Sequence, residues 1–93
     1  MNEHAPARCP VPYMQAGVDR YIVHGIPPGK FLTALFSNDL KGALCKADEH
    51  NTAAMRAWVL FMVNDMPSGA QGSPETVAAW IARHEADRQD AAA

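Results

Sequence analysis

The stretch HGIPPGKFL, residues His24 to Leu32, decides the fold because it separates two helical patterns. Apolar side chains before it recur at the spacing of one helix face, and Gly25 suits the left-handed residue that closes such a helix. Pro27 and Pro28 cannot continue that helix, because proline fixes φ and has no backbone N–H. A second apolar pattern begins directly after Lys30. The stretch therefore predicts a rigid corner between two helices.

The same stretch shares some residues with the phosphate-binding loop motif, which is GxxxxGK followed by Ser or Thr. Here only three residues separate Gly25 from the Gly29-Lys30 pair, and Phe31 stands where a hydroxyl would bind the metal ion. A helix, not a strand, is also expected before the loop. We therefore expect Lys30 to be an exposed lysine beside the corner, available to a partner.

Apolar periodicity and capping residues outside the corner predict further helices. Asp39 and Ser73 are typical N-cap residues, and Asp48 or Asn51 can cap another start. We expect helices over 12–24, 29–36, 40–47, 52–66 and 74–84, with no alternating β pattern between them. The sequence therefore predicts an all-α fold, a compact bundle of four to five short helices with disordered N- and C-terminal tails.

The 93 residues fit one small domain. Hydrophobic residues make up 48% and charged residues 19%, which is typical of a globular chain. We expect residues 1–11 to be a flexible N-terminal tail, residues 12–84 a single helical domain, and residues 85–93 a frayed C-terminal tail. A core of this size leaves little room for a large buried active site.

The charge balance argues against nucleic acid as the main partner. Eight Lys and Arg oppose ten Asp and Glu, for a net charge of -2, whereas phosphate binding needs a surplus of positive charge. The longest apolar run, Ala57 to Val63, is too short to cross a bilayer, and the N-terminus lacks the apolar region of a secretory signal. We expect a cytoplasmic protein with no membrane partner, in which Cys9 and Cys45 stay reduced.

The residue types that carry catalysis or bind metals form no recognisable motif. Four His and two Cys are scattered along the chain, and neither C-x-x-C nor H-E-x-x-H occurs. Cys45 could be paired with His50 or His24 as a nucleophile and its base, but it is more simply a small core residue of its helix. We therefore expect no enzyme activity, no metal and no cofactor.

The predicted helix 52–66 carries more apolar surface than one helix face. Its first set recurs at helical spacing and is expected to face the core: Met55, Trp58, Val59, Met62 and Met66. A second set falls outside that stripe: Leu60, Phe61 and Val63. We expect Leu40 and Leu44 to face the core from the preceding helix. An apolar excess of this kind indicates either a central helix or a face that meets a partner.

Protein binding is therefore the function that we expect. Trp58 and Trp80 are expected in the core, because large aromatic residues dominate small cores. The candidate partner-binding residues are then other aromatic or accessible side chains: Tyr13, Met14, Tyr21, Lys30, Phe36 and Phe61.

Three motifs resemble those of a group of short phage and prophage proteins. They are GIPPGKFL with the following NDL, NDMP at Asn64 to Pro67, and GSPE at Gly72 to Glu75, and the resemblance spans roughly residues 13–82. It implies an accessory phage protein and brings no catalytic residues with it. Small phage proteins of this size often bind and block a host protein, as inhibitors of CRISPR–Cas do, which is an analogy without a shared motif.

We thus expect non-catalytic binding to a host protein or protein complex, with inhibition of a host defence complex such as CRISPR–Cas as the leading case. Two alternatives stay open. One is a helical regulator that binds DNA, for which a dimer and a basic recognition helix would be needed. The other is a phage structural protein that binds to itself, with a homodimer as the simplest form.

Overall fold

The computed structural model describes residues 8–92, which form six α-helices, two short 3₁₀ helices and no strand. The all-α prediction is confirmed, with one helix more than the upper number expected. The elements are η1 (Pro12–Met14), α1 (Gln15–His24), α2 (Lys30–Phe36), α3 (Leu40–Lys46), α4 (Glu49–Ala53), α5 (Met55–Asp65), η2 (Ser68–Ala70) and α6 (Pro74–Ala92).

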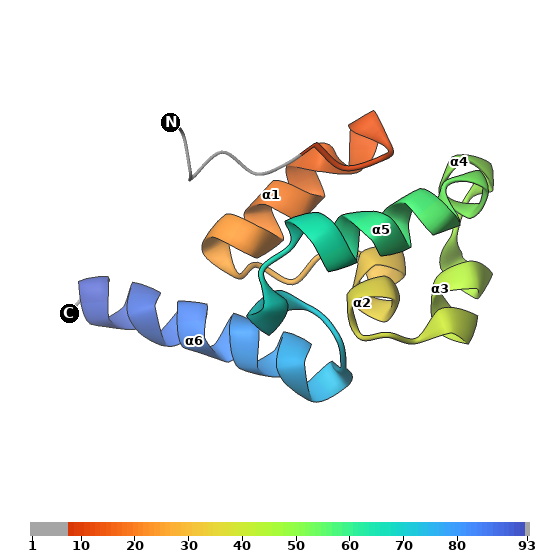
Figure 1. Cartoon of the computed structure of the whole chain (residues 1–93). Helices are drawn as coiled ribbons and strands as arrows, with labels where there is room; N and C mark the ends of the chain where they lie inside the picture. The colour runs from red at the N-terminus through yellow and green to blue at the C-terminus, as the bar shows by residue number, and fades with distance from the viewer. Residues whose placement is uncertain (1–7, 93) are drawn as a thin grey trace.

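The helices surround one apolar core (Figure 1). α1, α2 and α5 meet near its centre, α3 and α4 lie at one end, and the last turns of α6 extend beyond the other helices. The largest fully buried side chains come from the three central helices: Trp58, Tyr21, Phe36, Leu32 and Val18.

The predicted corner between α1 and α2 is confirmed. Gly25 ends α1 in the left-handed conformation, with φ 65° and ψ 24°, and its N–H donates to the carbonyl of Tyr21 at 2.9 Å. Gly29 then caps α2 in extended backbone. A side chain at Gly25 has no room, because its Cβ would lie 2.3 Å from the Cβ of His84 on α6. The corner therefore also sets how closely α6 packs on the rest of the fold.

Three predicted N-caps are confirmed, each by a side-chain oxygen that accepts a hydrogen bond from the backbone N–H three residues later. The pairs are Asp39 with Gly42 at 3.0 Å, Asp48 with Asn51 at 2.8 Å, and Ser73 with Thr76 at 3.0 Å. Such caps satisfy amides that have no partner inside the helix. They explain why α3 and α6 begin where the sequence places them, and why α4 begins directly after Asp48.

The predicted helix 52–66 begins earlier in the structure and is divided in two. Ala54 interrupts the helical run with φ -97° and ψ 11° and separates α4 from α5. Its N–H still donates to the carbonyl of His50 at 3.1 Å, and its carbonyl accepts from the N–H of Trp58 at 2.8 Å. The chain therefore bends at Ala54 while its backbone groups stay hydrogen-bonded, and this bend adds the sixth helix.

The packed region begins before residue 12, where the sequence places the start of the domain. Cys9 and Val11 are both buried in the core cluster. The N–H of Cys9 donates to the side-chain oxygen of Gln15 at 2.8 Å, which fixes this segment to the start of α1. Residues 1–7, most of the predicted N-terminal tail, lie outside the described residues.

The C-terminal helix is longer than the predicted helix 74–84. α6 continues to Ala92, and the guanidinium of Arg88 donates to the carbonyl of His24 at the end of α1. Residues 85–91 are nevertheless exposed to solvent, as the predicted tail implies, because this part of α6 has little to pack against. Residue 93 lies outside the described part of the chain.

Candidate functional site

The structure places three of the six candidate partner-binding residues in the core. Tyr21 and Phe36 are 0% exposed and Phe61 is 4% exposed. A partner cannot reach these side chains in the folded protein, so the assignment is corrected to a packing role. The reason is chemical: the aromatic residues that anchor interfaces are also the residues that fill a small core.

Tyr21 joins four parts of the fold. Its ring stacks on Phe36 with the ring centroids 5.3 Å apart, and its hydroxyl donates to the carbonyl of Ala70 in η2 at 2.7 Å. Its own carbonyl accepts from the indole N–H of Trp80 on α6 at 2.9 Å. Burial raises the pKa of Tyr21 to about 12, because the charged phenolate would lose its contact with water.

Phe61 packs in the same core from α5. Its ring lies edge-on to Trp58 with the centroids 5.9 Å apart. The indole N–H of Trp58 donates to the side-chain oxygen of the buried Asn51 at 3.0 Å. The core position predicted for Trp58 is thereby confirmed, and Phe61 belongs to the same cluster.

Tyr13 remains on the surface, at 58% exposure, and connects the N-terminal segment to α4. Its hydroxyl donates to a carboxylate oxygen of Asp48, and its ring lies edge-on to His50 with the centroids 6.0 Å apart. This hydrogen bond raises the pKa of Tyr13 and lowers the pKa of Asp48, because it stabilises the neutral phenol beside the charged carboxylate. The neighbouring Met14 is half-buried against the core.

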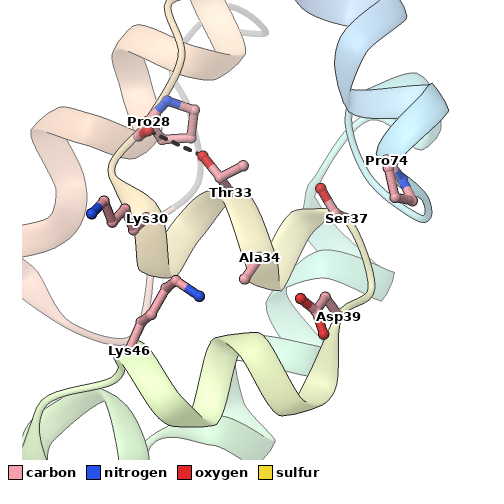
Figure 2. A pocket seen from close by; sticks show the side chains of 8 residues that line it. All are labelled: Pro28, Lys30, Thr33, Ala34, Ser37, Asp39, Lys46 and Pro74. Carbon is pink, nitrogen blue, oxygen red and sulfur yellow. Dashed lines mark hydrogen bonds between the residues drawn. The ribbon is translucent and has the colours of Figure 1, made fainter.

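Lys30 is exposed at a different place, a groove of about 460 Å³ between α2, α3 and the start of α6. Figure 2 shows Lys30 and Lys46 at one end of this groove and Asp39 at the other. The carboxylate of Asp39 already accepts the N–H of Gly42 as the cap of α3. None of the residues that line this groove also lines the groove beside Tyr13. The three candidates outside the fully buried core, Tyr13, Met14 and Lys30, therefore do not form one site.

Exposed large apolar side chains gather instead on α3 and α5. Leu40 and Leu44 are 64% and 45% exposed, and Val59 and Val63 are 47% and 70% exposed. We call these four residues the α3–α5 face. Leu40, Val59 and Val63 line a groove of about 190 Å³, which also reaches Met62 of the core. Single apolar side chains on a surface are ordinary, but four on two neighbouring helices, three of them lining one groove, indicate an interaction site.

The sequence predicts the opposite orientation for three residues of this face. Leu40, Leu44 and Val59 were expected to face the core, and only Val63 was expected outside it. The structure instead buries Ala43 of α3 at 0% exposure, which turns both leucines of that helix outward. The only indication of this face in the sequence was that the predicted helix 52–66 has more apolar residues than one helix face needs. On a helix that is apolar on nearly every side, hydrophobic periodicity does not show which side faces the core.

Other kinds of site have less support. Among residues 8–92, no group of three or more His, Cys, Asp or Glu is placed to hold a metal ion. Cys9 and Cys45 are free thiols, the first buried and the second exposed. Burial raises the pKa of Cys9, which keeps this thiol protonated. None of the helices described is long and apolar enough to cross a membrane.

No protein-family model matches this chain, and no curated protein or solved structure matches it at a significant level. The assignment of a functional site therefore depends on geometry and chemistry. On those grounds the α3–α5 face is the strongest candidate, because it gathers exposed apolar side chains whose burial would favour association with a partner.

Proposed function

We propose that this protein acts by non-catalytic protein binding through the α3–α5 face. The observation that supports the proposal is the exposure of Leu40, Leu44, Val59 and Val63, of which Leu40, Val59 and Val63 line one groove. Removal of apolar surface from water is the main favourable contribution to most protein association. A small domain would gain stability by turning such side chains inward, so their outward placement favours a contact with another molecule.

The proposed partner is a host protein, and a component of a host defence complex such as CRISPR–Cas is the first target to test. This part of the proposal is supported by the resemblance of the GIPPGKFL and GSPE motifs to short phage proteins. The protein would act by occupying a surface of its target in a stoichiometric complex. Such an action needs no catalytic group in this chain.

The substitution Val63→Glu tests the face, with Val23→Glu as its control. Both valines are exposed helical residues, at 70% and 43%, but Val23 lies on α1 away from the groove. We expect wild-type protein and Val23→Glu to capture the same stoichiometric partner from a bacterial host, and Val63→Glu to lose it. Circular dichroism must show that all three are equally folded. Equal capture by Val63→Glu would remove the face from the proposal.

The target class is tested in a host with CRISPR–Cas immunity. Expression of the wild-type protein should raise the plating efficiency of a targeted phage, and Val63→Glu should return it to the immune level. An unchanged plating efficiency with the wild-type protein would remove CRISPR–Cas as the target. The capture experiment would then identify the host protein that is bound instead.

A further inference from the structure

The groove of the α3–α5 face has a size and a lining that select among kinds of partner. Its volume is about 190 Å³, and the larger apolar side chains that line it are Leu35, Leu40, Met55, Val59, Met62 and Val63. We infer that it receives one amphipathic helix of a partner protein, whose apolar side chains enter the groove and whose acidic side chains lie beside Lys41 and Arg56. The inference rests on the proposed function and specifies the segment that the face binds.

The volume of the groove favours side chains over a small molecule. Small-molecule pockets are typically about 300–1,000 Å³, and this groove is smaller. An amphipathic helix offers a row of apolar side chains at i, i+3 or i+4, and i+7, which can enter a groove between two helices. Met55 and Met62 have unbranched, flexible side chains that adapt to the shape of such an anchor.

The area of the face is too small for a permanent dimer. With about half to two-thirds of each side chain in solvent, its residues expose on the order of 400 Å² of apolar surface, the size of an ordinary functional patch. An obligate homodimer takes more than about 1,000 Å² from each subunit, roughly two-thirds of it apolar. One helix seated between α3 and α5 covers the face without needing that area.

The charges beside the face favour an acidic partner. Lys41 is exposed on α3, and Arg56 is exposed on α5 three residues before Val59, on the same side of the helix. Neither cation has an ion-pair partner among residues 8–92. The one acid that lines the groove, Asp39, is engaged as the cap of α3. Acidic residues on the partner helix complement this rim, whereas a two-fold dimer would bring two cationic rims together.

The test selects peptides against the full-length protein. A yeast-displayed library fixes leucine at the i, i+4 and i+7 positions of a short helix and varies the flanking positions. We expect enrichment of Asp and Glu at the flanks. The selected peptides should bind Val59→Glu and Lys41→Glu/Arg56→Glu at least tenfold more weakly, and Lys30→Glu as tightly as wild type. Peptides with Lys at the flanks should bind Lys41→Glu/Arg56→Glu more tightly than wild type.

Several results would overturn the inference. They are a library with no enriched peptide, enriched peptides with basic flanks, or binding that Val59→Glu leaves unchanged. A concentration-dependent dimer in sedimentation that Val59→Glu abolishes would assign the groove to a second copy of the chain. All substituted residues are exposed, and unfolding curves check that each variant is folded before binding is measured.

The inference and the proposed function fail in different ways. Capture of a host partner that depends on Val63, without selection of acidic helices, would overturn the helix and retain protein binding. Loss of both would refute the proposed function itself. A final test replaces Val63 with a photoreactive residue and identifies the segment of the captured partner to which it crosslinks. If the inference holds, that segment has an apolar stripe flanked by acidic residues.

Discussion

Replacing Gly25 with alanine tests the corner that positions α1, α2 and α6. Gly25 has φ 65°, a left-handed conformation that disfavours a residue with a Cβ by about 1–2 kcal/mol. The new Cβ would also lie 2.3 Å from the Cβ of His84, while ordinary contact begins at 3.4 Å, so α6 must move away by about 1.1 Å there. Steric overlap in a packed region costs about 1–3 kcal/mol.

The two effects predict that Gly25→Ala lowers the free energy of unfolding by about 2–5 kcal/mol. A domain of this size has roughly 5–14 kcal/mol in total, so the loss is measurable by urea unfolding. Gly29→Ala is the matched control, because its φ is -64° and no atom lies within 4 Å of the added Cβ. We expect it to change the free energy by less than about 1 kcal/mol.

The variant Gly25→Ala/His84→Gly separates the two causes. In the His84→Gly background the clash is absent and the backbone strain remains, so Gly25→Ala should cost only about 1–2 kcal/mol. His84→Ala should give no such relief, because it keeps the Cβ that clashes. The reasoning is refuted if Gly25→Ala is no more harmful than Gly29→Ala, or if its cost is the same with and without the His84 side chain.

Three further predictions concern packing and hydrogen bonds. Gly17→Ala should raise the free energy of unfolding by about 1 kcal/mol in thermal melts, because the residue lies inside α1 and its nearest neighbour would be 3.7 Å away. Asn51→Leu should lower it by about 1–3 kcal/mol in urea, because the buried indole N–H of Trp58 loses its acceptor. Folded Tyr21 keeps a proton that the unfolded chain releases near its ordinary pKa of 10.0, so stability should fall as the pH rises from about 10 to about 12. Urea curves at several pH values check this slope, which Tyr21→Phe should reduce.

The starts and ends of the helices could be predicted from the sequence because single residues determine them. Gly25 ends α1 because glycine adopts the left-handed conformation easily, and the two prolines that follow prevent the helix from continuing. Asp39 and Ser73 start α3 and α6 because their side chains accept hydrogen bonds from nearby backbone N–H groups. These effects are local, so they need no knowledge of the tertiary fold. The bend at Ala54 has no such marker, and the sequence did not predict it.

The orientation of the helices could not be predicted in the same way. In α5, apolar residues occupy nearly every side, so the choice between Phe61 and Val59 as the inner residue depends on what the neighbouring helices offer. Phe61 gains the contact with Trp58, and Val59 is left in solvent. The candidate site was missed for this reason, since its side chains were assigned to the core.

The unequal burial of the two thiols makes the native protein suitable for site-selective labelling. Cys45 is exposed and directly follows Leu44 of the α3–α5 face, whereas Cys9 is buried and held protonated. A maleimide dye should therefore attach to Cys45 without any substitution, because the thiolate is the reactive species. The emission of such a dye would change when a molecule covers the neighbouring groove, which gives a fluorescent reporter of occupancy in the unmodified sequence.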